Sequence, residues 1–239
     1  MRNIFISIVF FSLIFVGCSA RINGNLYENG SADLSLNTAL EPRMAVLIRS
    51  FSRLNNNSST QNNNVIDGAS IAASMTQAPG VKAINLRNIN PTTIEGTINI
   101  AKINDFLTIS GSQNFISYEQ TGTNGKITIT LNRNTAPQIV SVLSPDIADY
   151  LSALMAPVAT GEALSRREYI SLVQSVYGRG VADEISSARV QLSITFPRQI
   201  NTIRGGTISG TSRNRGEFDI PLIDLLVLEN NLIYEVTWR

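Results

Sequence analysis

The chain has 239 residues, with 19 basic and 18 acidic side chains, a single cysteine and no histidine. This near balance of charge argues against nucleic acid as a partner, because phosphate backbones demand a clear positive excess. Without histidine, Ser-His-Asp triads, Cys-His dyads and imidazole metal sites are impossible, and no Gly-x-Ser-x-Gly elbow or phosphate-binding glycine loop occurs. We therefore expect no metal, no cofactor and no catalytic residue of these classes.

The N-terminus carries an uncharged, largely apolar run at residues 4–16, which follows Arg2 and ends at Gly17 and Cys18. Thirteen helical residues at about 1.5 Å each reach roughly 20 Å, which is short of the ~30 Å hydrocarbon core of a bilayer. A basic start, an apolar run of this length and a small residue before the cut predict a secretory signal peptide over residues 1–17.

The end of this run resembles the lipobox of bacterial lipoproteins, in which a short apolar pair and Gly or Ala precede an invariant Cys. The resemblance implies cleavage between Gly17 and Cys18, a diacylglyceryl group on the Cys18 thiol, and a fatty acid such as palmitate on the new amine. Phe15 stands where Leu is usual, as in the relaxed lipoboxes of spirochaetes. We expect attachment to the cell membrane or outer membrane through this lipid, with the domain outside the cytoplasm. The alternative for a lone cysteine is a buried, inert thiol.

The segment after the cysteine, residues 18–30, is polar and carries two glycines, so it is predicted to be a lipidated tether. An alternating strand is expected at residues 31–36. A helix over about residues 39–54 follows, opened by a capping box from Thr38 to Glu41. The Asn-rich tract at residues 55–64 is typical of an exposed loop, and residues 67–76 predict a second, short helix.

The middle of the chain changes to a period of two. A strand is expected around residues 94–100, and the clearest element is a hairpin at residues 114–133. Asn124 and Gly125 are predicted to form its type I′ turn, because that turn needs positive φ at both central residues. This register places Tyr118 opposite Leu131.

Helices are then expected at residues 135–143, 144–155, 165–177 and 181–187, with a capping box from Ser165 to Glu168 opening the third. Strands return at residues 190–196, 200–204, 207–211, 218–220 and 232–238, with a short helix at residues 221–228. This order lacks the regular alternation of a parallel sheet. We predict a single α+β domain over residues 31–239, with a mostly antiparallel sheet and helices packed on one face.

Residues 196–226 resemble the C-terminal part of the LppM-type lipoprotein domain, which runs from a Phe-Pro strand through a glycine-containing turn. Its final strands end near an aromatic residue, here Trp238. A spirochaete lipoprotein family of the same build is the alternative. The resemblance implies an α+β domain that faces the envelope and binds a lipid or glycolipid, and it supplies no catalytic residue.

The leading hypothesis is a non-enzymatic, membrane-anchored envelope lipoprotein that binds a lipid, glycan or protein of the envelope. Its ligand is expected in a hydrophobic groove between the sheet and the helices around residues 137–177, unless these faces simply pack together. A carboxylate-based glycan or peptidoglycan hydrolase, with two acids roughly 5–10 Å apart in a cleft, is the first alternative. The second is a surface-exposed interaction or scaffold lipoprotein that meets its partner through loops such as the Asn-rich tract. Arg204, Arg213 and Arg215 near the glycine turns either meet anionic headgroups or form a solvated loop.

Overall fold

The computed structural model describes residues 18–54, 64–76, 78–107, 115–141 and 145–239. The predicted signal peptide at residues 1–17, including Gly17, lies outside the described residues. The same holds for residues 55–63 of the Asn-rich tract and for residues 142–144, where one helix was expected to begin.

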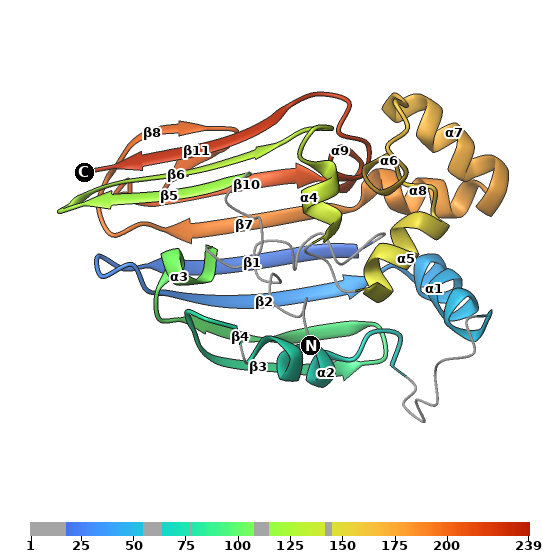
Figure 1. Ribbon diagram of the computed structural model, residues 1–239, viewed down its shortest axis with the longest axis horizontal. Coiled ribbons are helices and arrows are strands. Elements are labelled where there is room, and N and C mark those ends of the chain that lie inside the picture. The colour runs from blue at the N-terminus through green and yellow to red at the C-terminus, as the bar shows by residue number, and fades with distance from the viewer. Residues whose placement is uncertain (1–17, 55–63, 77, 108–114, 142–144) are drawn as a thin grey trace.

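The described strands form two sheets, which Figure 1 shows with their strands running along the long axis of the molecule. One sheet has the order β3-β4-β2-β1-β7-β10-β9, and the other has the order β5-β6-β11-β8. Their bounds are β1 Cys18–Leu26, β2 Ala32–Leu40, β3 Val81–Asn90, β4 Thr93–Ile100, β5 Ile116–Thr121, β6 Asn124–Leu131, β7 Arg189–Thr195, β8 Ile200–Arg204, β9 Thr207–Ser209, β10 Arg215–Pro221 and β11 Leu232–Trp238. Within the described residues β1 and β7 pair in parallel, and the other paired strands are antiparallel.

The helices gather mainly at one end of these sheets, where Figure 1 shows α1, α5, α7 and α8 together. Their bounds are α1 Pro42–Leu54, α2 Gly68–Met75, α3 Ile103–Leu107, α4 Ala136–Ser141, α5 Pro145–Ala153, α6 Pro157–Thr160, α7 Arg166–Tyr177, α8 Arg179–Ser187 and α9 Leu222–Val227. In the part of the chain that the structure describes, no helix has both the length and the apolar character to cross a membrane. The α+β class and the mostly antiparallel pairing are confirmed. The strands divide between two sheets, a feature that the sequence analysis did not anticipate.

Residues 18–26 differ from the predicted tether, because they form β1 in the interior of the larger sheet. Cys18 pairs with Leu40 of β2 on one side, and Ala20 pairs with Val190 of β7 on the other. The even-numbered positions from 20 to 26 are buried and the odd-numbered ones are exposed, which is the alternation of a half-buried strand. Gly24 occupies one of the inward positions, so the apolar pattern was interrupted in the sequence.

The hairpin of β5 and β6 is confirmed, but the prediction of its turn is wrong. Tyr118 pairs with Ile127, four residues away from the predicted partner, and the loop consists of Gly122 and Thr123. Gly122 has a φ of +59°, which suits glycine at the first central position of a tight hairpin turn. Because this shift in pairing is even, the side chains still share the predicted face.

Gly125 has another role than a turn residue. A Cβ atom there would lie 2.0 Å from Cζ2 of Trp238, so the indole packs directly on the glycine backbone. The absence of a side chain at this position is needed for the close approach of β11 to β6.

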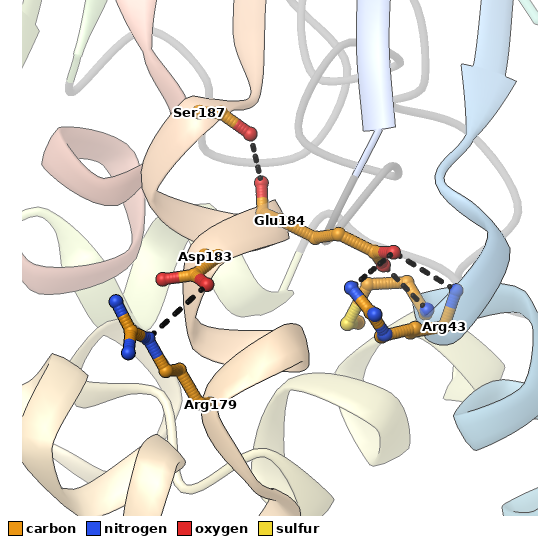
Figure 2. Close-up of polar contacts among 6 residues, drawn as sticks. Arg43, Arg179, Asp183, Glu184 and Ser187 are labelled. Atoms are coloured by element: carbon orange, nitrogen blue, oxygen red, sulfur yellow. Dashed lines mark hydrogen bonds and ion pairs between the residues drawn. The ribbon is translucent and has the colours of Figure 1, made fainter.

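The start of α1 also differs from the prediction. Thr38 lies within β2 and is fully buried, so it does not cap a helix. The helix begins at Pro42, and the backbone N–H groups of Arg43 and Met44 donate to the Glu184 carboxylate of α8 at 3.1 and 2.9 Å (Figure 2). A distant side chain therefore satisfies the free donors that begin this helix. The capping box from Ser165 to Glu168 is confirmed at the start of α7.

Candidate functional site

An apolar cavity of about 180 Å³ lies between the two sheets. Strands β1, β2, β4, β7 and β10 line it from the larger sheet, β5, β6 and β11 line it from the smaller sheet, and α3 and α9 add further walls. The lining side chains are aliphatic or aromatic except for Asn25 and the hydroxyl of Tyr234. The cavity therefore offers almost no hydrogen-bonding partners to a ligand inside it.

Several inward-facing side chains around this cavity are only half-buried. Leu34, Leu192 and Ile194 on the larger sheet and Ile127 and Ile129 on the smaller sheet all line the cavity and are neither buried nor exposed. In a closed sandwich the inner faces interdigitate and bury such side chains. Their partial exposure is explained by space that the two sheets leave unfilled.

The floor of the cavity depends on a glycine in β1. At Gly24 a Cβ atom would lie 2.5 Å from Cδ2 of Leu34 and 2.9 Å from Cδ1 of Ile194. The two side chains therefore lean over the glycine backbone toward β1. A larger residue at this position would push them upward into the cavity, so the small residue helps to keep the space open.

An aromatic cluster stands beside one wall of the cavity. The ring of Phe196, which lines the cavity, lies 5.2 Å from the indole of Trp238, and Tyr118 stacks on the indole at 6.2 Å. Trp238 is only 2% exposed. The indole is thus shielded from water but separated from the cavity by a single side chain.

An ion pair with one buried partner lies on α9, outside the cavity lining. The Arg166 Nε atom lies 2.8 Å from Oδ1 of Asp224, which is buried. Burial raises the pKa of the Asp224 carboxyl, and the charges of Arg166 and Arg189 oppose this rise. Burial, followed by the charge of Asp224, raises the pKa of Tyr234 to about 12. The phenol that lines the cavity is therefore neutral at physiological pH.

A second, polar depression lies on the opposite face of the larger sheet, over β1, β7, β10 and β9. It contains Glu217 and Asp219, which are two residues apart on β10, so both side chains point to the same face of the sheet. Both carboxylates are exposed. Glu217 accepts a hydrogen bond from Ser209 at 2.7 Å, and the Asp219 carboxylate lies 4.0 Å from Arg189. The general acid of a glycosidase lies in apolar surroundings, which neither of these side chains has.

The apolar cavity does not lie at the groove predicted around residues 137–177: none of these residues lines it, and the inner faces of the described helices there are packed. Side chains that are at most 2% exposed include Ile139, Leu151, Leu154, Tyr169 and Val173. The structure supports the alternative, in which these helical faces pack together. The apolar cavity lies instead between the sheets.

The other residues singled out in the sequence are distributed over the fold. Cys18 is the first residue of β1, at the end of the larger sheet. Arg204 lies on β8 of the smaller sheet, whereas Arg215 lies on β10 of the larger sheet and donates to Ser193 at 2.6 Å. Among the described residues, no three or more acidic or Cys side chains are grouped to hold a metal ion.

The chain was compared with known proteins. No protein-family model matches it, and no curated protein matches it. Among solved structures it is similar to the folded domain of LppM from Mycobacterium tuberculosis, determined by NMR. The match covers 93% of this chain and 89% of that domain, with a TM-score of 0.42 and 10% sequence identity. LppM is the domain type that residues 196–226 resemble. At this level of similarity, no function is transferred from that domain to this chain.

Proposed function

We propose that this chain is an envelope lipoprotein that is anchored through a lipid on Cys18 and holds an acyl chain in the cavity between its sheets. The observation that carries the proposal is the cavity itself, with a volume of about 180 Å³ and a lining of Leu, Ile, Phe, Val and Ala side chains. An engineered protein cavity of about 150 Å³ with a similar lining takes up benzene. The space between the sheets is therefore large enough for a segment of an apolar chain.

The lining also determines which ligands are favoured. Each methylene group that leaves water for such a cavity contributes about 0.8 kcal/mol to binding. A polar or charged group would lose its water without gaining a partner, because only Asn25 and Tyr234 present polar atoms. We therefore expect an apolar tail to enter the cavity while any headgroup remains outside it.

Binding is tested by native mass spectrometry of the mature chain after removal of endogenous lipid. Saturated fatty acids of increasing length are added, and we expect one acyl chain per protein, with affinity that rises with chain length until the cavity is full. The matched control is Ile194→Phe, which narrows the cavity and is expected to abolish the adduct. If no adduct forms, or if the variant binds as the parent does, acyl-chain binding in this cavity is excluded.

Anchoring is supported by the lipobox-like sequence that ends at Cys18. The replacement Cys18→Ser removes the only thiol that a diacylglyceryl group can modify. We expect this variant to accumulate as the unprocessed precursor in fractionated cells. A variant that is cleaved and retained in the envelope like the parent would contradict the anchoring.

The two alternatives find less support in the described residues. Glu217 and Asp219 share the polar depression, where a carboxylate-based hydrolase could use them, and both are exposed. A scaffold that acts through the Asn-rich tract would depend on residues 55–63, which are not among the residues that the structure describes. The double variant Glu217→Gln and Asp219→Asn is expected to remain attached to the envelope and to bind fatty acid as the parent does.

A further inference from the structure

The outer face of the larger sheet carries polar side chains in rows that cross several strands. In one row Arg21 of β1 pairs with Gln191 of β7, and Gln191 pairs with Asp219 of β10. The next row adds β9 and consists of Asn23, Ser193, Glu217 and Thr207. Ser193 is half-buried and the others are exposed. Because alternate residues of a strand share a face, these side chains lie on the side of the sheet away from the apolar cavity.

The two rows lie in the polar depression, which has a volume of about 720 Å³. This volume is within the range of ligand pockets. Neighbouring strands lie about 4.8 Å apart, so a depression that crosses β1, β7, β10 and β9 is roughly 14 Å wide. Gly205 and Gly206, at the turn from β8 into β9, also line it. The outer face is therefore hollowed where the two rows meet this turn.

Hydrogen-bond donors and acceptors stand side by side in the polar depression. In the first row the Arg21 guanidinium donates to the amide oxygen of Gln191 at 3.3 Å, and Asp219 is the neighbour of Gln191 on the other strand. In the second row the Ser193 hydroxyl accepts a hydrogen bond from Nε of Arg215 at 2.6 Å. Guanidinium and amide N–H groups thus alternate with carboxylate, amide and hydroxyl oxygens.

The charges that line the polar depression are balanced. They belong to two arginines and two acids, which are Arg21, Arg215, Glu217 and Asp219. Asp219 lies 4.0 Å from Arg189. In the described part of the chain, neither Arg21 nor Arg215 forms an ion pair with a carboxylate. Each guanidinium has five N–H donors, so both keep donors for a ligand beyond the bonds to Gln191 and Ser193.

We propose that the polar depression binds a neutral glycan strand, at a site separate from the acyl-chain cavity. Each sugar hydroxyl both donates and accepts hydrogen bonds, so it leaves water at little cost only where donors and acceptors stand side by side. The polar depression meets this condition, whereas the apolar cavity does not. An anionic ligand would be repelled by the two carboxylates and a cationic ligand by the two guanidinium groups. An uncharged, polyhydroxylated chain is therefore the ligand that this surface fits.

Binding is measured by isothermal titration calorimetry with the full-length protein in a detergent that has no sugar headgroup. The ligands are neutral tetrasaccharides of glucose, mannose and N-acetylglucosamine, with the galacturonic acid tetramer as the anionic control and the glucosamine tetramer as the cationic control. We expect at least one neutral tetrasaccharide to bind more tightly than either control, with an affinity that salt does not change because the ligand is uncharged. If no neutral tetrasaccharide binds, or if a charged control binds as tightly, the proposal is overturned.

Substitutions locate the bound glycan. Arg21→Ala and Glu217→Ala each remove hydrogen-bonding groups from the polar depression and should weaken binding about fivefold. Arg87→Ala and Glu95→Ala are the matched controls, because they remove an arginine and a glutamate from the same face of the sheet outside the depression, and they should bind as the parent does. Urea midpoints that match the parent's show that each variant is folded. Equal weakening by all the variants, or none by Arg21→Ala and Glu217→Ala, overturns this site.

Discussion

Replacement of Ile194 by phenylalanine tests whether the space between the sheets is empty. Ile194 lines the cavity and is half-buried, so the larger side chain has room to extend into it. The change adds three carbon atoms, each of which contributes about 0.8 kcal/mol when buried, so the free energy of unfolding should rise by at most roughly 2.4 kcal/mol. An empty cavity of 180 Å³ lowers the free energy of unfolding by ~4 kcal/mol at about 24 cal/mol per Å³, so the expected gain is smaller than this cost.

The sign of the effect is decisive, because the same change in a packed interior lowers the free energy of unfolding by about 1–3 kcal/mol. Ile98 provides the control, since it is 2% exposed on β4 and does not line the cavity. Urea unfolding, followed through the fluorescence of the single tryptophan, is measured for residues 18–239 produced without the predicted signal peptide and with Cys18→Ser, so that neither processing nor detergent is needed. We expect Ile194→Phe to stabilise the protein and Ile98→Phe to destabilise it. Equal destabilisation by both would refute the empty cavity.

Three further predictions concern the contacts that hold the fold. Glu184→Ala leaves two N–H groups of α1 without an acceptor and should lower the free energy of unfolding by about 1–3 kcal/mol in urea, whereas the exposed Asp183→Asn should change it by less than about 0.5 kcal/mol. Because burial raises the pKa of Asp224, the folded state binds this proton more tightly than the unfolded state does. The stability of the parent relative to Asp224→Asn should therefore fall as the pH rises from about 4 through the folded pKa, and an opposite slope would contradict the burial. Gly125→Ala places a Cβ atom against the Trp238 ring, so the thermal midpoint should fall and the emission shift to the red, and unchanged emission would disprove this contact.

Much of the secondary structure could be predicted because its causes are local. The capping box at Ser165 and Glu168 satisfies its own helix, and α7 begins where the sequence indicates. The hairpin turn was misplaced because Gly125 is adjacent in space to Trp238, which lies far along the chain. The α1 cap was missed for the same reason, since Glu184 lies 140 residues from Met44.

The cavity could not be predicted from alternation of apolar residues. Alternation shows that a strand has an inner face but does not show to which sheet the strand belongs. Gly205 and Gly206 join β8 and β9 in sequence, yet these strands belong to different sheets. The space between the sheets depends on this division and on Gly24. The need for a small residue at this position follows from the packing of Leu34 and Ile194 over it, which the sequence does not show.

Quenching of Trp238 by a brominated fatty acid tests acyl-chain binding most directly. The indole is shielded from water and lies 5.2 Å from Phe196 in the cavity wall, so a bromine atom within the cavity comes close to it. We predict that the brominated chain quenches the emission of the parent but not that of Ile194→Phe, and that aqueous iodide quenches neither. Equal quenching of parent and variant, or no quenching of the parent at saturating fatty acid, would contradict an acyl chain bound between the sheets.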